Sequence, residues 1–357
     1  MEDYCELNQL LCGACLALST AAFAQVTLTV NEPLTGKTYT FPVIVSATES
    51  SPNGPSGWDV YLESNLVVHN TSSSGRLDTT FPASAGSHTV VVKAWDNSGA
   101  DTSASETITV DTSSLPTPPE NAIQYPNLQN NGVLGTWTIC DGTCSGSTTG
   151  GTGTDGFKFN VSSPSLSGAG MEMYSEGTTP DDEWNTLGYQ HLGCPSGGCT
   201  SVSNFLEDMW FYIPSSSTAL QATEYDPGVY DGTYKSFASM QCDSNSGDWR
   251  FWNSAANSWT ILSSTGGTLP VYKCNILSEE YSWHHYQLYV TMNFTSHTIT
   301  YETFVVDGVT VYSDIANKYD ALAYAGTPTI NIEQQIDNHT ADVTDSEYLD
   351  NYNLWVW

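Results

Sequence analysis

Polar and apolar residues alternate in short runs along this chain, and the alternation predicts strands rather than helices. Residues 26–30, 58–62 and 106–110 show the pattern, with Gly, Pro, Ser and Asn between the runs. A period of two puts successive side chains on opposite faces of a strand, so each run predicts a half-buried strand. Several such strands separated by turn residues are typical of a β-sandwich.

A proline-rich stretch at residues 113–120 divides the chain. Prolines favour an extended, semi-rigid linker, so we expect one domain before it and another after it. The second part shows no convincing amphipathic helix, and its strand patterns continue to Trp357. Two apolar runs surround Asp307-Gly308, which predicts a tight hairpin. The predicted organisation is a signal peptide at 1–24, a β-sandwich at 25–112, a linker at 113–122 and a larger all-β domain at 123–357.

The first domain resembles a bacterial immunoglobulin-like domain. The resemblance lies in residues 86–99, Gly-Ser-His-Thr-Val-Val-Val-Lys-Ala-Trp-Asp-Asn-Ser-Gly, a strand and turn that recur near the end of such modules. It implies an immunoglobulin-like sandwich that serves as a spacer, a docking unit or a sugar-binding accessory.

The second domain resembles the concanavalin-A-like or laminin-G-like jelly-roll superfamily. The resemblance lies in Trp283-His284-His285, which leads into a strand, followed by the hairpin at Val306-Asp307-Gly308. It implies a two-sheet jelly roll, a fold that hosts lectins, glycoside hydrolases, polysaccharide lyases and adhesion modules.

Charge narrows the range of partners. The chain has 39 acidic and 8 basic residues, a formal net charge of −31. Phosphate binding needs clustered Lys and Arg, so we expect neither nucleic acid nor an anionic membrane surface as a partner. No segment is long and apolar enough for membrane insertion, whereas an apolar run followed by Ala22-Phe23-Ala24 predicts a secretory signal. We therefore expect a secreted protein, extracellular or on the cell surface.

Cysteine spacing agrees with secretion. Six of the nine cysteines follow the signal segment, an even number that suits an oxidising compartment. Close spacing favours the pairs Cys140–Cys144 and Cys194–Cys199, which leaves Cys242 and Cys274 to pair by default. Six cysteines allow about 15 connectivities, so this pairing is a preference among alternatives.

Two carboxylates form the main candidate for chemistry. Glu224 and Asp226 share one face of a predicted strand, where two like charges so close together push one of the two pKa values upward. Paired carboxylates supply the acid, base or nucleophile of glycoside cleavage. Retaining glucanases of the jelly-roll superfamily carry the motif E-x-D-x-x-E, but here the last position is Val229, so the residue that matches their acid/base is absent.

Other strands supply partners for this pair. Asp337 and Gln335 share a face at 329–337, and we expect Asp337 to face Glu224 across a cleft. Two tryptophans, Trp249 and Trp252, lie three residues apart and therefore point to opposite faces. We assign both to sugar stacking, although one of the two can instead belong to the core. The predicted substrate-binding residues are Trp249, Trp252, Gln335 and Tyr225.

The sequence supports three functions. The leading hypothesis is recognition of an extracellular polysaccharide, with possible hydrolysis through Glu224, Asp226 and Asp337. One alternative is a non-catalytic adhesion or structural role with self-association. The other is a polysaccharide lyase. Residues 234–241 are similar to a strand of alginate lyases, but the domain has few Lys and Arg residues to bind the carboxylates of uronates. No cofactor is certain. Structural calcium is an option, with acidic clusters as candidate ligands at Asp181, Asp182, Glu183, Asp342, Asp345, Glu347 and Asp350.

Overall fold

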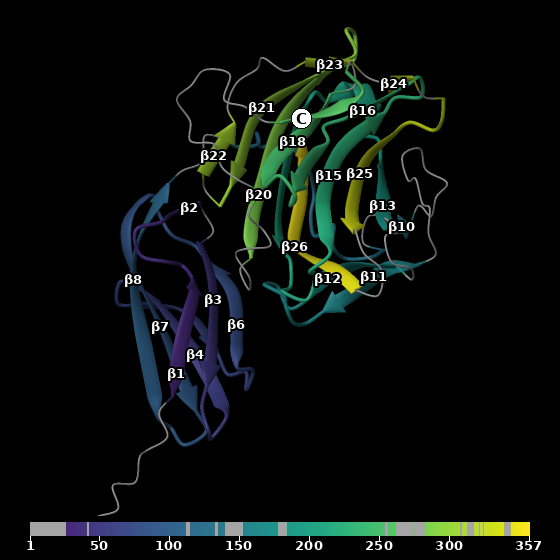
Figure 1. Cartoon of the computed structure of the whole chain (residues 1–357). Helices are drawn as coiled ribbons and strands as arrows, with labels where there is room; N and C mark the ends of the chain where they lie inside the picture. The colour runs from purple at the N-terminus through teal and green to yellow at the C-terminus, as the bar shows by residue number, and fades with distance from the viewer. Residues whose placement is uncertain are drawn as a thin grey trace, which may run out of the picture.

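The chain folds as two β-sandwiches in a computed structural model (Figure 1). The structure describes residues 26–40, 43–111, 115–132, 135–139, 153–177, 184–253, 256–261, 274, 283–307, 309–312, 318–320, 322–323, 325–338 and 344–357. Within these residues the regular structure is strand apart from one short 3-10 helix, η1 (Cys199–Ser201). The predicted all-β fold class, with one smaller and one larger β-sandwich, is confirmed.

Two sheets make the first sandwich. A three-stranded sheet has the order β1-β3-β6, and a five-stranded sheet has the order β2-β8-β7-β4-β5. Their bounds are β1 (Thr27–Glu32), β2 (Thr38–Thr40), β3 (Val43–Ser50), β4 (Pro55–Leu62), β5 (Asn65–Asn70), β6 (Arg76–Phe81), β7 (Gly86–Asp96) and β8 (Asp101–Asp111). Apolar side chains from both sheets fill the space between them, as the alternation predicts; among them are Val43, Val45, Trp58, Val60, Leu77, Val90 and Val92.

Two larger sheets make the second sandwich. We call the first the β15 sheet, with the order β10-β13-β25-β15-β17-β18-β19, and the second the β14 sheet, with the order β11-β12-β26-β14-β20-β21-β22. Strands β16 and β24 extend the β15 sheet, and β9 and β23 extend the β14 sheet.

The strands of the β15 sheet are β10 (Thr138–Ile139), β13 (Trp184–Gly193), β15 (Leu220–Tyr230), β16 (Tyr234–Phe237), β17 (Met240–Asp243), β18 (Asp248–Asn253), β19 (Ser258–Ile261), β24 (Leu322–Ala323) and β25 (Thr329–Asn338). Those of the β14 sheet are β9 (Ile123–Tyr125), β11 (Gly153–Val161), β12 (Gly170–Gly177), β14 (Asn204–Tyr212), β20 (His284–Asn293), β21 (Thr298–Val306), β22 (Val309–Tyr312), β23 (Lys318–Asp320) and β26 (Thr344–Val356). The hairpin predicted at Asp307-Gly308 joins β21 to β22, where Val306 pairs with Val309.

The space between the two large sheets is mostly apolar but contains two glutamic acids. Glu207 on β14 accepts a hydrogen bond from Tyr352, and Glu347 on β26 accepts hydrogen bonds from Thr223 and Tyr225. Both glutamates are fully buried, and burial raises the pKa of each to about 8. These carboxyls are therefore protonated, and held by hydroxyl groups, at neutral pH.

The two sandwiches pack against each other through the β14 sheet. Three aromatic residues of the second sandwich, Trp210, Tyr212 and Trp283, belong to the same buried apolar cluster as the core of the first. Arg76 of β6 lies over the Tyr212 ring, 5.0 Å from its centroid. The contact is therefore apolar and aromatic, with one cation–π interaction at its edge.

Two of the three predicted disulfides are present, Cys194–Cys199 and Cys242–Cys274. The third, Cys140–Cys144, lies outside the described residues, as does the predicted signal peptide at 1–24. No helix in the described part of the chain has the length and apolar character to cross a bilayer.

Candidate functional site

Strand β15 holds Glu224 and Asp226 on the outer face of the β15 sheet, the face turned away from the β14 sheet. The inner face is identified by Thr223 and Tyr225, whose hydroxyls reach Glu347 of the opposite sheet. Because side chains alternate along a strand, Glu224 and Asp226 point the other way. The predicted pairing of these two carboxylates on one face therefore agrees with the strand geometry.

Strand β25 places three more polar residues beside them. Its inner face is marked by Gln334, which contacts Met209 of the other sheet, so Glu333, Gln335 and Asp337 lie on the outer face. The antiparallel register pairs Glu224 with Gln335 and Asp226 with Glu333. Asp337 is one pair further along, and it accepts a hydrogen bond of 2.8 Å from the Gln335 amide.

The position of Asp337 corrects one expectation. It does not face Glu224 across a cleft, because β25 and β15 are adjacent strands of one sheet. The two carboxylates are instead diagonal neighbours on the same face. Diagonal neighbours on an antiparallel pair are about 7–8 Å apart.

The surroundings of Glu224 favour its protonated form. Burial raises the pKa of Glu224 well above its ordinary value, and the charges of Asp337 and Asp226 raise it further. The Gln241 amide, which donates a hydrogen bond to Glu224, and the positive charge of Arg250 oppose this effect. Glu224 is 7% exposed, so the desolvation cost dominates.

Asp226 and Glu333 form a second acidic pair. They sit directly opposite each other, where like charges destabilise a sheet. Burial and then Glu333 raise the pKa of Asp226, and burial raises the pKa of Glu333. Glu333 accepts hydrogen bonds of 2.9 Å from the Tyr230 hydroxyl and the Asn331 amide, whereas the buried Oδ1 atom of Asp226 has no hydrogen-bond partner.

Strands β17 and β18 continue this face with amide and guanidinium groups. Gln241 pairs with both Glu224 and Arg250, so the three side chains form a row across the sheet. Arg250 binds Asp243 at 3.0 Å. The Oε1 atom of Gln241 and the Nε atom of Arg250 are buried without hydrogen-bond partners, which leaves one acceptor and one donor unsatisfied beside Glu224.

A second row runs across four strands and the residue just before β17, and it ends in an aromatic residue on each side. Trp252 on β18 lies beside Ser239, because its backbone N–H donates to the Ser239 carbonyl. The register then continues through Asp226 and Glu333 to Tyr189 on β13. We call this line the aromatic-ended row: Trp252, Ser239, Asp226, Glu333 and Tyr189. Its ends are four strand spacings apart, about 19 Å.

Two residues predicted to bind substrate lie on the wrong side of the sheet. Trp249 is 2% exposed and packs against Phe211, Tyr286 and Phe304. Tyr225 is fully buried and bonded to Glu347. Neither ring is available to a ligand, because both point between the sheets. Of the two tryptophans, Trp252 is the one that lies outside the core. It is half-buried and contacts Trp259, with 5.5 Å between the ring centroids.

The sequence alone misses four outer-face residues: Tyr189, Glu333, Gln241 and Arg250. The signal for Glu333 was present, because it alternates with Gln335 and Asp337 on the same strand. Gln241 and Arg250 become visible only through the strand register, which joins β17 and β18 to β15.

The acidic residues considered as calcium ligands are hydrogen-bonded to the protein where they are described. Asp345 accepts from the Ala219 amide, Glu347 is bonded between the sheets, and Asp350 accepts from Ser165 and Ser167. Among the described residues no three His, Cys, Asp or Glu side chains converge as cation ligands. The other candidates, Asp181, Asp182, Glu183 and Asp342, lie outside the described residues.

Comparisons with known proteins give only distant similarity. No protein-family profile and no curated protein matches the sequence. Among solved structures, the chain is similar to fibronectin(III)-like modules of Clostridium thermocellum CbhA, with 19% identity over 24% of this chain and 98% of the other and a TM-score of 0.22.

Two further structures come from proteins named for carbohydrates. A structure of carbohydrate-binding modules of the β-sandwich superfamily shares 14% identity over 92% of this chain and 96% of the other, with a TM-score of 0.27. The carbohydrate esterase of Shiga toxin-encoding bacteriophage phi24B shares 13% identity over 62% and 88%, with a TM-score of 0.32. These likenesses are too distant to support an argument about function, so the proposal below depends on the outer face itself.

Proposed function

We propose that the outer face of the β15 sheet binds a neutral extracellular polysaccharide. The observation that carries this proposal is the aromatic-ended row, in which Trp252 and Tyr189 flank Asp226 and Glu333. The flat ring of an aromatic side chain offers an apolar surface to the C–H face of a sugar, and carboxyl and amide oxygens accept hydrogen bonds from its hydroxyls. A span of about 19 Å suits several consecutive sugar rings.

The charge of this face selects the ligand class. Glu224, Asp226, Glu333 and Asp337 lie there together, while Arg250 is already bonded to Asp243. A polyuronate would add carboxylates beside groups whose pKa values are already raised, so its binding would cost further electrostatic free energy. The proposal therefore favours a neutral glycan over the acidic polymer that a polysaccharide lyase cleaves. Secretion, supported by two disulfides and by the sequence of residues 1–24, would expose the protein to such glycans.

We expect Trp252→Ala to weaken binding to a neutral polysaccharide by about tenfold or more, because stacking of one aromatic ring contributes on the order of 1 kcal/mol beyond the area that it buries. Affinity electrophoresis through gels containing soluble xyloglucan, galactomannan or mixed-linkage β-glucan measures the loss as reduced retardation. Tyr189→Ala should act in the same direction.

The matched control is Trp95→Ala, which removes a half-buried tryptophan on β7 of the first sandwich. It should migrate like the wild type in every gel, and a pectin gel should retard none of the proteins. The comparison is made in the gel that retards the wild type most. Equal retardation of the wild type and Trp252→Ala in that gel would refute polysaccharide binding by the outer face of the β15 sheet. If none of the neutral polymers retards the wild type, the adhesive or structural function becomes the better explanation.

Hydrolysis is the second candidate function, and the environment of Glu224 favours it. A general acid must hold its proton near neutral pH, and burial together with Asp337 and Asp226 raises the pKa of Glu224. Its diagonal position puts the Asp337 carboxylate close enough to raise the pKa of Glu224, and glycosidases likewise use two neighbouring carboxyl groups. In this proposal Glu224 protonates the leaving oxygen, Asp337 activates water, and Asp226 tunes the proton affinity of Glu224.

We expect Glu224→Gln to abolish release of reducing sugars from the retained polysaccharide, because an amide N–H is not acidic enough to be transferred to the leaving oxygen. The loss should be about 100-fold or more, the usual contribution of a general acid. Glu302→Gln, on β21 of the other sheet, is the matched control and should keep full activity. Release that persists in Glu224→Gln would contradict the catalytic assignment and leave the face as a binding site.

A further inference from the structure

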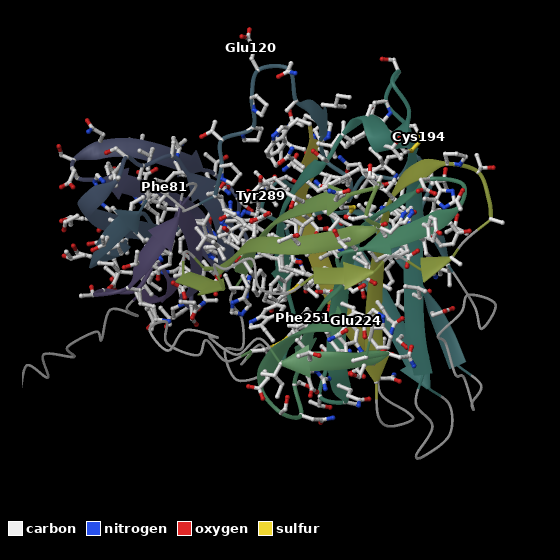
Figure 2. The ribbon with its side chains drawn as sticks, turned by 90° about the horizontal axis from the view of Figure 1, so that it is seen from above. Phe81, Glu120, Cys194, Glu224, Phe251 and Tyr289 are labelled. Carbon is white, nitrogen blue, oxygen red and sulfur yellow. A yellow bond between two sulfur atoms is a disulfide. The ribbon has the colours of Figure 1, made fainter. Side chains whose placement is uncertain are left out.

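A cavity of about 770 Å³ lies where the two sandwiches meet, away from the outer face of the β15 sheet. Its walls come from four parts of the chain: the turn between β6 and β7, the end of β8, the proline-rich linker, and the outer face of the β14 sheet. A volume of several hundred Å³ and a position between domains are both typical of ligand sites. Glu120, which lines the cavity, lies near the top of the view in Figure 2, far from Glu224.

Asp208 and Gln287, which line the cavity, belong to a chain of polar side chains that also includes His285. His285 Nε2 lies 2.9 Å from Asp208 Oδ1, and the Gln287 amide donates a 2.7 Å hydrogen bond to Asp208 Oδ2. The His285 ring stacks on Trp210 at 4.3 Å between centroids, which holds this chain in place.

Gln287 ends the chain with an unsatisfied acceptor. The residue is only 7% exposed, and its Oε1 atom has no hydrogen-bond donor. Its other amide atom is committed to Asp208, so the amide cannot turn without losing that bond. Asp208 and Gln287 both line the cavity. A buried acceptor without a donor destabilises the fold, and a ligand that donates a hydrogen bond there would recover that loss.

The remaining walls are mostly apolar. Leu206, Trp355 and the linker prolines line the cavity beside the two polar residues. Leu206 pairs with Trp355 on one side and with Tyr289 on the other. Tyr289 in turn stacks on Trp357 at 5.8 Å, with an angle of 3° between the rings. The aromatic surface therefore continues from the cavity along the outer face of the β14 sheet.

We propose that this junction cavity is a second carbohydrate site, which binds a neutral sugar unit. A sugar presents hydroxyl donors to Gln287 Oε1 and Asp208, and it presents an apolar C–H face to Trp355. The carboxylates of Asp208 and Glu120 at the same cavity repel anionic ligands, so phosphate and uronate are disfavoured. Because the linker and both sandwiches form its walls, a bound sugar would also fix the two domains in one relative position.

The test uses the full chain carrying Trp252→Ala and Tyr189→Ala, so that its outcome does not depend on the first proposed site. Isothermal titration with cellopentaose, xylopentaose and mannopentaose should detect binding of at least one sugar by this double variant. Adding Ala85→Trp, which places an indole in the cavity from an exposed turn, should abolish that binding. Ser87→Trp, at an exposed position of β7 outside the cavity wall, is the control and should leave it unchanged.

A second variant tests the acceptor itself. Gln287→Met keeps the side-chain length but removes Oε1, and it should weaken the residual binding by tenfold or more with the melting temperature little changed. The proposal is overturned if none of the three sugars binds the double variant. It is equally overturned if Ala85→Trp and Gln287→Met bind as strongly as their parent.

Discussion

The melting temperature of this protein should fall as the pH is raised from 5 to 9. Glu207 and Glu347 have pKa values raised to about 8 by burial between the sheets, and Glu32 has one raised to about 7 by burial at the junction of the sandwiches. In the unfolded chain these groups ionise near pH 4.3. Between that pH and about 8 the folded state therefore retains protons that the unfolded state has lost.

The sign of the pH effect follows from proton linkage. Where the folded state binds more protons, the free energy of unfolding decreases as pH rises. One pKa unit corresponds to about 1.4 kcal/mol, so Glu207 and Glu347 each cost the folded protein a few kcal/mol by pH 9. Below about pH 4 the unfolded chain also holds these protons, and their contribution becomes independent of pH.

Thermal unfolding at fixed ionic strength measures this slope. Glu347→Gln supplies an uncharged side chain of the same shape, whose carbonyl still accepts from Tyr225, so its melting temperature should vary less with pH and exceed that of the wild type at pH 9. Glu302→Gln, outside this core, should keep the slope of the wild type. A melting temperature that is constant or rises from pH 5 to 9 would show that the two core glutamates are not held protonated.

Removal of the Cys242–Cys274 disulfide should destabilise the second sandwich by about 3–4 kcal/mol, the loop-closure entropy of a loop of this length. The bond joins residues 32 apart and ties Cys274 to β17, the strand that carries Gln241. The double variant Cys242→Ala/Cys274→Ala should melt roughly 10 °C below the wild type, because a change of 1 kcal/mol shifts the melting temperature of a domain of this size by about 2–4 °C.

The second disulfide provides the matched comparison. Cys194 and Cys199 are five residues apart, and so short a loop contributes only about 2 kcal/mol. Cys194→Ala/Cys199→Ala should therefore lower the melting temperature by less. A larger loss from the short loop than from the long one would contradict the loop-closure explanation.

Local patterns predicted the strands and the hairpin because both depend on nearby residues. Alternation identified the strands that carry Glu224 and Asp337, and the Asp307-Gly308 turn fixed a neighbouring pair. The three-residue spacing of Trp249 and Trp252 also placed the two rings on opposite faces, although it could not tell which face is buried.

The same alternation, applied consistently, excludes Tyr225 from the site. A residue between Glu224 and Asp226 must point to the other face of the strand. The structure confirms this orientation, since Tyr225 bonds Glu347 between the sheets. The assignment of Tyr225 to substrate binding followed from its sequence proximity and ignored the period of two.

Register across distant strands is the information that the sequence lacks. Gln335 pairs with Glu224 from more than 100 residues away, and Tyr189 joins the same face from a third strand. Nothing local to these residues indicates which strands become neighbours in a two-sheet sandwich. The junction cavity has the same origin, because it exists only where the linker folds over the β14 sheet.

The most direct test of sugar binding by the β15 sheet is a crystal structure of the protein soaked with the neutral oligosaccharide whose parent polymer is retarded most strongly. We expect electron density for consecutive sugar rings along the aromatic-ended row, with one ring on Trp252 and hydroxyls within hydrogen-bond distance of Asp226 and Glu333. An empty outer face in crystals whose junction cavity or other surface holds the sugar would contradict the proposed function.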